Sequence, residues 1–465
     1  MQHQENNDEL DLYRIVLFSS CSERVLVIPD NGRLLLPSIS VPRYQRPAEH
    51  LTASLESKWA QRAVCLFALE GGQATGLRYH VMQSCEQGPR CRAGSLWARL
   101  SSLVESQFHE ATDYAAVMDS VSQCQEPAGG QRAFARLNCF SELTAWVGKV
   151  AAPQGLALSG NFSQFNAGPA FSLVRFETCG PALWFKAVGE PNLREFPITL
   201  ALSNYFPAFL PSMLAFREDW NAWLAIEAKG QHPGETSPLD VWRTVAVTLA
   251  DLQIASMGRT LHLADLGCHD TRPFALSELV QPFLEAMAEL MAQQTKPLPQ
   301  ALSRDELNSL ASQLQEILSD AAELEIPNSI GHLDFNPGNI VVSAGRCVFL
   351  DWAEASIGHP FITFEYLLEH FRRCQGIDDP AVSALTKTYV DQWRPFLSPC
   401  QIERAMSLAP VLAVLAYAVS SNAWRQSSCL HPEIARHLRS LTRRLKREAD
   451  RWVSARIRGE SSCLS

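Results

Sequence analysis

The chain of 465 residues lacks an excess of positive charge, since 40 Lys and Arg stand against 49 Asp and Glu. A net charge of −9 gives no basic footprint of the kind that nucleic-acid-binding domains carry, so we expect no nucleic-acid partner. The polar, acidic N-terminus lacks the apolar core of a signal peptide. No apolar run approaches the roughly 20 residues that cross a bilayer, so we expect no membrane association. These absences predict a cytoplasmic protein.

Metal-binding cysteine spacing is also missing. The 13 cysteines are scattered and include no Cys-x-x-Cys pair, which argues against a structural zinc site. Without a signal peptide, we expect these cysteines to be reduced and mostly in cores. No internal repeat or low-complexity segment interrupts the chain. The remaining composition, 46% hydrophobic and 19% charged, is that of a globular protein with two or three domains.

Residues 1–125 are predicted to form a small α+β accessory domain. A turn at Pro29–Gly32 joins two of its short strands. The strands are expected at 13–18, 25–28, 33–36, 63–69 and 79–82, with a break at Gly71–Gly72, and the helices at 47–61, 95–105 and 111–121. The Pro- and Gly-containing stretch Glu126–Gln131 then predicts a linker, and a connector helix extends from Arg132 to Val150, so that 126–150 joins two domains.

The remainder of the chain has a two-lobed α+β pattern. Residues 151–230 predict a small antiparallel β lobe, in which the strand 182–188 carries Lys186. A helix is expected from Leu193 to Phe206, opened or kinked by Pro197 and with Glu195 near its start. Residues 231–465 predict a helical lobe, in which Asp240 is expected to cap a long helix. A nucleotide would fit in the cleft between two such lobes.

The most informative stretch is Gly331–Asn339, with the sequence GHLDFNPGN. Its Pro and Gly predict a loop, and a hairpin of two short strands follows it. The hairpin brings Asn339 and Asp351 together at its open end, and Asp334 lies on the loop just before it. Phosphoryl transfer needs such a set, because one carboxylate accepts a hydroxyl proton while an amide oxygen and a second carboxylate hold Mg²⁺.

The order His-x-Asp-x-x-x-x-Asn, hairpin, hydrophobic-Asp-Trp resembles the aminoglycoside phosphotransferase and choline kinase family, whose fold is protein-kinase-like. The resemblance covers roughly residues 150 to 400. It implies an Mg²⁺-dependent enzyme that transfers the γ-phosphoryl group of ATP or GTP to a hydroxyl group of a small molecule. It also implies that Asp334 is the catalytic base, that His332 stabilises the catalytic loop, and that Asn339 and Asp351 are the metal ligands.

The same resemblance assigns the nucleotide-binding residues. Lys186 would contact the α- and β-phosphates and pair with Glu195 on the following helix. The segment 223–228 resembles the hinge that meets the adenine, and from it we take Ile226, Glu227 and Ala228 as site residues. The phosphate-covering loop is expected within 160–168 and matches no glycine-rich signature well. Its candidate residues are Gly160, Asn161 and Gly168.

Two positions depart from the family pattern. Leu333 stands where the family usually has Gly, and Thr363 stands where it often has Asp. Thr363 is expected to cap a helix over 365–371 instead. These departures bear on substrate and rate more than on fold.

Ordinary structural roles remain open for several of these residues. Asp334 alone would be taken as a turn-capping residue, and Lys186 as a solvent-facing lysine of a strand. Glu190 competes with Glu195 as the partner of Lys186. The remaining residues are expected to be structural or solvent-exposed: Trp352 in the core, His359 and His370 as non-ligands, and the basic stretch 436–458 as a solvated helix face.

The accessory domain weakly resembles the Nudix fold, in which a glutamate-rich helix holds Mg²⁺ for pyrophosphate hydrolysis. The corresponding helix here has only Glu49 and Glu56, so a domain of this kind would have lost hydrolysis and would serve binding or regulation. An unrelated α+β domain is equally compatible with the pattern. For the whole chain, an active small-molecule kinase and a nucleotide-binding regulatory module of the same fold both remain open. The hydroxylated acceptor and the oligomeric state are not specified by the sequence.

Overall fold

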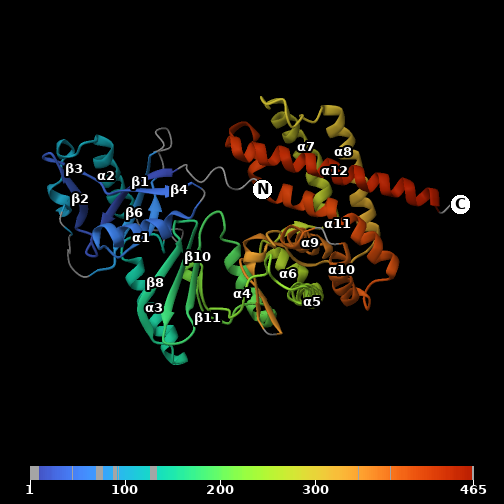
Figure 1. Ribbon diagram of the computed structural model, residues 1–465, viewed down its shortest axis with the longest axis horizontal. Helices are drawn as coiled ribbons and strands as arrows, with labels where there is room; N and C mark the ends of the chain where they lie inside the picture. Colours follow the sequence, from blue (N-terminus) through green and yellow to red (C-terminus); the bar gives the residue numbers. More distant parts are fainter. Residues whose placement is uncertain are drawn as a thin grey trace. The chain divides into compact units, whose positions relative to one another are not determined.

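The computed structural model describes residues 10–43, 45–69, 77–86, 92, 94–125, 133–343, 345–376 and 379–462. The linker expected at Glu126–Gln131 and the break expected at Gly71–Gly72 lie outside these ranges. The chain divides into two compact units (Figure 1). The N-terminal unit comprises Met1–Phe196 and Ser212–Glu227, and the C-terminal unit comprises Pro197–Pro211 and Ala228–Ser465.

The accessory part of the N-terminal unit is a seven-stranded sheet with the central order β3-β2-β1-β6-β5, on which β4 pairs with β1 and β7 with β2. Strands β1 and β6 are parallel, and the other pairs are antiparallel. Its elements are β1 (Leu10–Phe18), β2 (Arg24–Asp30), β3 (Arg33–Leu35), β4 (Ser38–Pro42), α1 (Pro47–Trp59), β5 (Ala63–Ala68), β6 (Leu77–Ser84), β7 (Leu96–Arg99) and α2 (Ala111–Gln125).

The helix expected over 95–105 is wrong. Residues Leu96–Arg99 instead form β7, which pairs antiparallel with β2, and Trp97 is buried there. Short 3-10 turns follow at Leu100–Ser102 and Glu105–Gln107. A free edge on β2 offers backbone hydrogen bonds and a buried face, and such tertiary pairing overrides the weak local preference of this segment for helix.

A second sheet forms the rest of the N-terminal unit, with the order β11-β12-β10-β9-β8 and antiparallel pairing throughout. This confirms the small antiparallel sheet expected from the sequence. Its elements are α3 (Cys139–Ala151), β8 (Leu158–Asn166), β9 (Phe171–Thr178), β10 (Leu183–Val188), β11 (Met213–Arg217) and β12 (Ala222–Ile226). Helix α4 (Glu195–Tyr205) begins in this unit, and its residues from Pro197 onward belong to the C-terminal unit. Pro197 lies in the first turn of α4, where a missing N–H removes no helical hydrogen bond. The connector helix begins at Cys139, later than expected.

The accessory sheet and the second sheet share one hydrophobic core. Buried side chains of β1, β5 and β6 belong to the same cluster as those of α3, β9 and β10. The outer strands of the two sheets also meet through Gln164, a buried residue of β8. Its amide accepts a hydrogen bond from Cys65 N–H at 2.8 Å and donates one to Cys65 C=O at 3.0 Å. The side chain of Gln164 therefore pairs with the edge of β5 as a neighbouring strand would.

The C-terminal unit is mainly helical, with three short strands in one sheet (β13-β17-β14) and a two-stranded hairpin (β15-β16). The helical lobe expected from the sequence is thus present. Its elements are α5 (Leu239–Ser256), α6 (Thr260–Asp265), β13 (His269–Thr271), α7 (Pro273–Ala292), α8 (Arg304–Glu323), β14 (Ser329–His332), β15 (Ile340–Ser343), β16 (Arg346–Phe349), β17 (Ala355–Gly358), α9 (Phe361–Gln375), α10 (Asp379–Trp393), α11 (Pro399–Ser420) and α12 (Pro432–Ser462).

One expectation for this unit needs correction. Asp240 does not cap α5, because the helix begins at Leu239 with Pro238 at the cap position, and Asp240 lies inside the first turn. Helix α11 bears on the separate expectation that no apolar run is long enough to span a membrane. By length and composition alone this helix could cross a bilayer, with a mean hydropathy of 1.5 over its most apolar window. Two thirds of that window is buried against the rest of the unit, as in the core helix of a globular domain.

His359 is a buried titratable group of this unit. Neither of its ring nitrogens has a hydrogen-bond partner among the described residues, and its ring packs edge-on against Phe361. Burial lowers the pKa of His359 to about 4 from an ordinary value of 6.5. As the pH falls, His359 is therefore protonated near pH 6.5 in the unfolded chain but only near pH 4 in the folded chain. The stability conferred by the neutral ring is present above pH 6.5 and is lost as the pH falls toward 4.

We predict that His359→Leu makes stability less dependent on pH. Between pH 6.5 and 4, the wild-type chain should lose up to about 1.4 kcal/mol of unfolding free energy per pH unit through this residue. Thermal unfolding at a series of pH values measures the effect. His262→Leu, at an exposed position, is the control and should leave the pH dependence unchanged. Equal pH dependence in His359→Leu and wild type would contradict the prediction.

Candidate functional site

The loop between β14 and β15 presents Asp334 to solvent. Two amide side chains of the same loop hold its carboxylate. Asn336 Nδ2 donates to Asp334 Oδ1 at 2.9 Å, and Asn339 Nδ2 donates to Asp334 Oδ2 at 3.2 Å. Asn336 Oδ1 accepts from Gly338 N–H, which fixes the turn that the Pro-Gly pair begins. The carboxylate is thus exposed to a reacting group but restrained in orientation.

The hairpin predicted from the sequence is confirmed. Ile340 pairs with Phe349, and one step further Leu350 N–H donates to Asn339 C=O at 2.8 Å. Asn339 and the residue that follows Leu350, which is Asp351, therefore lie at the same open end. Asp351 is exposed and has a left-handed backbone, with φ of 59°, a conformation that Asp tolerates better than most side chains.

The ring of His332 connects the loop to the hairpin. Its Nδ1 accepts a hydrogen bond from Asp334 N–H at 3.2 Å, so its Nε2 carries the proton and donates to Leu350 C=O at 3.0 Å. Burial lowers the pKa of His332, although the nearby Leu350 carbonyl and acidic groups oppose this shift. A neutral ring with both nitrogens bound to backbone groups cannot carry a proton to or from a substrate. His332 is a positioning residue in this geometry.

Thr363 supports the same loop from behind. Its hydroxyl accepts a hydrogen bond from His332 N–H at 3.0 Å, and both residues are buried. The expectation that Thr363 caps a helix is wrong, because α9 begins at Phe361 and Thr363 lies within its first turn. Gly331 is required beside it, since a Cβ there would lie 2.8 Å from Thr363 Oγ1 and 2.7 Å from Ser356 Oγ.

A segment that sequence reasoning missed ties the chain after β12 to the hairpin. Gln231 and Val342 exchange two backbone hydrogen bonds of 2.9 Å each, and His232 Nδ1 bonds to Ile340 C=O at 2.8 Å. Gly230 allows this approach, because a Cβ there would lie 2.4 Å from Val342 O, and its φ of 151° disfavours other residues. In the sequence, the signal for this contact is Gly230, which directly precedes Gln231 and His232.

The donor set fits a magnesium ion by its chemistry. Asn339 Nδ2 donates both to the carboxylate and, at 2.9 Å, to the backbone C=O of Asp334, so the amide oxygen faces away from Asp334. That oxygen and the exposed carboxylate of Asp351 are hard ligands, which Mg²⁺ prefers. Asp334 adds a second carboxylate nearby, and two acidic groups beside a polyphosphate are compatible only with a bound cation.

Two more residues of the C-terminal unit, His370 and Tyr417, lie close enough to Asp334 to interact with its charge. Burial lowers the pKa of His370, and the negative charge of Asp334 opposes that shift. Burial raises the pKa of Tyr417, and the charges of Asp334 and Glu354 raise it further. Tyr417 is 40% exposed and belongs to α11, so an aromatic side chain from a distant segment lies close enough to Asp334 to feel its charge. The sequence gave no indication of Tyr417.

In the N-terminal unit, the expected pair of Lys186 and Glu195 is present. Lys186 Nζ lies 2.6 Å from Glu195 Oε1, and the two side chains are only 12% and 2% exposed. The ammonium group also lies over the rings of Phe171 and Trp223, at 5.2 and 5.8 Å from their centroids. Glu195, and not Glu190, is therefore the partner of Lys186. Whether the pair contacts a nucleotide stays a prediction.

The expected hinge residues lie at the end of β12, with Ile226 as its last residue and Glu227 and Ala228 just after it. The N–H groups of Ile226 and Glu227 donate to Ser212 and Ala182 carbonyls, so neither is available to a base. For Ala228 N–H, no backbone acceptor is recorded within the described ranges. Among the hinge N–H groups, Ala228 is therefore the one left to meet a ligand.

The side chain of Glu227 is held by two neighbours that the sequence did not reveal. Arg175 binds it with two hydrogen bonds, of 2.6 Å from Nε and 3.1 Å from Nη2, and Trp184 Nε1 donates at 3.0 Å. The hydrogen bonds from Arg175 lower the pKa of Glu227, so this carboxylate is charged and fully engaged. It gives the end of β12 a fixed position.

The phosphate-covering loop expected within 160–168 is placed wrongly at its start. Gly160 and Asn161 belong to strand β8, which continues to Asn166, because β9 pairs with this segment. The turn between β8 and β9 comprises residues 167–170 and contains Gly168, whose φ is 151°. Of the three candidate residues, Gly168 alone lies in the turn.

We predict that Thr363→Val destabilises the C-terminal unit by about 1–3 kcal/mol, since it leaves the buried His332 N–H without its acceptor. Thr363→Ser keeps the hydroxyl and should retain most of the stability. Denaturant unfolding of both variants measures the difference. A Val variant as stable as the Ser variant would show that the hydroxyl does not support the loop.

For the Lys186–Glu195 pair, we expect each single substitution, Lys186→Met or Glu195→Leu, to cost on the order of 3–5 kcal/mol, because each removes one charge of a largely buried pair. The double substitution should cost clearly less than the sum of the two. A double-mutant cycle by denaturant unfolding gives the coupling energy. Additive costs would mean that the two charges do not stabilise each other.

Comparison with known proteins adds a family match. Residues 208–396 match the phosphotransferase enzyme family. No curated protein matches the chain. Similar solved structures include macrolide 2′-phosphotransferase type I, which is 16% identical in sequence. The match covers 64% of the present chain and 95% of the macrolide phosphotransferase, with a TM-score of 0.41. Choline kinase LicA from Streptococcus pneumoniae has 12% identity, coverage of 68% and 99%, and a TM-score of 0.44. Plasmodium vivax ethanolamine kinase has 11% identity, coverage of 75% and 91%, and a TM-score of 0.45.

Proposed function

The C-terminal part of the chain carries a phosphotransferase-family domain over residues 208–396, and from this premise we propose that the protein is a small-molecule kinase. It transfers the γ-phosphoryl group of ATP or GTP to a hydroxyl group of a small acceptor. The observation that carries the proposal is the single network in which His332 bonds both the base loop at Asp334 and the metal hairpin at Leu350. If Asp334 only capped a turn, a buried histidine joining its loop to the hairpin would not be required.

Each residue of the C-terminal unit has a separate task in this proposal. Asp334 accepts the proton of the acceptor hydroxyl, because it is exposed and its carboxylate is oriented by two amides. Asn339 and Asp351 hold Mg²⁺, which neutralises phosphate charge when it is bound. His332 and Thr363 keep the loop in place.

The nucleotide-binding residues of this proposal are Lys186, Glu195 and Gly168 of the N-terminal unit, together with Ala228 of the C-terminal unit. Lys186, oriented by Glu195, binds the α- and β-phosphates. Ala228 N–H meets the base, and the turn that contains Gly168 covers the phosphates. This turn has a single glycine, fewer than a glycine-rich loop offers, so its backbone N–H groups approach phosphate at fewer points.

A nucleotide-binding regulatory module of the same fold is the second candidate, and the poor glycine content of the turn at 167–170 favours it. The two functions differ in turnover. A regulatory module would show a rise in melting temperature with Mg²⁺ and nucleotide, without release of diphosphate for any acceptor.

We predict that Asp334→Asn lowers turnover by a factor of about 10³, within the usual range for loss of a general base. The assay follows Mg²⁺-dependent release of ADP or GDP by the full chain against a panel of hydroxylated small molecules. Asp240→Asn, an exposed aspartate of the same unit, is the matched control and should retain wild-type turnover. Turnover that survives Asp334→Asn undiminished would rule out the proposed base.

A further inference from the structure

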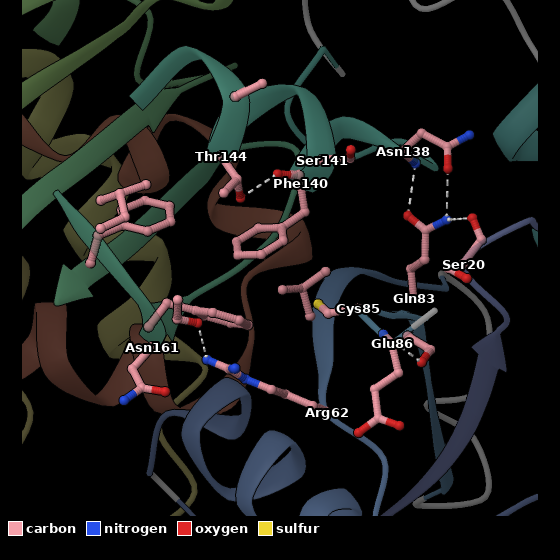
Figure 2. A pocket seen from close by; sticks show the side chains of 17 residues that line it. Ser20, Arg62, Gln83, Cys85, Glu86, Asn138, Phe140, Ser141, Thr144 and Asn161 are labelled. Atoms are coloured by element: carbon pink, nitrogen blue, oxygen red, sulfur yellow. Dashed lines mark hydrogen bonds between the residues drawn. The ribbon is translucent and has the colours of Figure 1, made fainter. Parts of the chain in front are cut away.

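A pocket of about 880 Å³ lies within the N-terminal unit, and none of the residues proposed for phosphoryl transfer lines it (Figure 2). Three parts of the unit line it: the ends of β5 and β6 in the accessory sheet, the first turns of α3, and the start of β8 with the neighbouring part of β9. Its volume is within the range of pockets that bind small molecules.

One wall of the pocket is aromatic. Phe140 of α3, Phe162 of β8 and Phe176 of β9 pack together, with ring centroids 4.4 Å apart for Phe140 and Phe162 and 6.0 Å apart for Phe140 and Phe176. Phe176 is buried, whereas Phe140 and Phe162 remain partly exposed. A wall of this kind favours a planar ring, because aromatic rings gain energy by offset or edge-on contact beyond the apolar area they bury.

Arg62 borders this wall, and Figure 2 shows it extending toward the strand that carries Asn161. Its Nη2 donates to Gly160 C=O at 2.7 Å, and its guanidinium lies 4.6 Å from the ring centroid of Phe162. These contacts orient the group without neutralising it. Within the described ranges, no carboxylate lies at ion-pair distance from Arg62.

The rest of the polar lining consists of hydroxyl and amide side chains and one acid. The hydroxyls and amides belong to Ser20, Gln83, Ser84, Asn138, Ser141, Thr144 and Asn161. Of these, Thr144 already donates to Phe140 C=O and Gln83 to Asn138. The acid is Glu86, whose Oε2 is buried without a hydrogen-bond partner among the described residues. A lining with one oriented cation, several donors and one acid favours a ligand with a single negative charge over one with several.

We propose that this pocket binds a small molecule that joins one planar aromatic ring to one carboxylate. The ring lies against the phenylalanine wall, and the carboxylate meets the guanidinium of Arg62, whose planar fork suits two parallel hydrogen bonds to a carboxylate. The residues that line this pocket have no role in the proposed phosphoryl transfer. The binding proposal can therefore be tested independently of the kinase proposal.

The test is isothermal titration of the full chain with three probes. The first is 3-phenylpropionate, the second is its amide 3-phenylpropanamide, which lacks the charge, and the third is propionate, which lacks the ring. We expect 3-phenylpropionate to bind roughly tenfold more tightly than 3-phenylpropanamide, since one charge-assisted hydrogen bond contributes about that factor. It should also bind more tightly than propionate, because only 3-phenylpropionate buries a ring against the phenylalanine wall. Equal affinity for the acid and its amide would overturn the proposal.

Four variants place the binding in this pocket. Arg62→Gln should weaken binding of 3-phenylpropionate roughly tenfold, while Arg33→Gln, at an exposed position of the same domain, should leave it unchanged. Ser141→Trp, from an exposed position of α3, should block the pocket without disturbing the core. Glu86→Gln should tighten binding, because it removes the opposing charge.

Melting temperatures show which variants are folded. If Arg62→Gln does not fold, Ser141→Trp decides the outcome, because its side chain lies on the surface of the helix. Binding of 3-phenylpropionate that persists unchanged in Arg62→Gln or Ser141→Trp, or that weakens in Glu86→Gln, overturns the proposal.

Discussion

The position of one imidazole ring decides whether the proposed site residues can act together. His332 accepts from the backbone of Asp334 and donates to the backbone of Leu350, and it can do both only as the neutral tautomer with its proton on Nε2. Desolvation keeps the ring in that neutral form. Because Leu350 directly precedes Asp351, the ring sets the separation between the proposed base on one loop and the proposed metal ligand on another. Thr363 extends the same constraint to α9 by holding the backbone of His332.

A second constraint joins the accessory domain to the small antiparallel sheet. The outer strand β8 takes part in two structures at once, since its backbone pairs with β9 while the side chain of Gln164 pairs with the edge of β5. The shared core makes these two sheets one unit in packing terms. Strand β8 leads directly into the turn at 167–170, which contains Gly168. Any ligand that alters the packing between the accessory sheet and β8 therefore acts on the strand that carries this turn.

Much of the site could be predicted from the sequence because its residues are close together along the chain. Pro337-Gly338 and two short apolar runs separated by Ser343–Gly345 specify a loop and a hairpin, and these two elements alone bring Asn339 to Asp351. Contacts between distant segments were not available in this way. The hydrogen bond from His332 to Thr363 and the pairing of Gln231 with Val342 depend on how separate elements pack. The error over 95–105 has the same origin, since the vacant edge of β2 and not the local sequence makes Leu96–Arg99 a strand.

The proposed activity depends most on a divalent cation that Asn339 and Asp351 would hold, and paramagnetic Mn²⁺ can report on that site directly. Electron paramagnetic resonance of Mn²⁺ titrated with the full chain and a non-hydrolysable ATP or GTP analogue gives the fraction of metal bound. We expect tight binding in the wild type, a loss of roughly tenfold or more in Asp351→Asn, and no change in Asp219→Asn, an exposed aspartate of the other unit. Equal Mn²⁺ affinity in wild type and Asp351→Asn would contradict the assignment of the metal site and of the activity built on it.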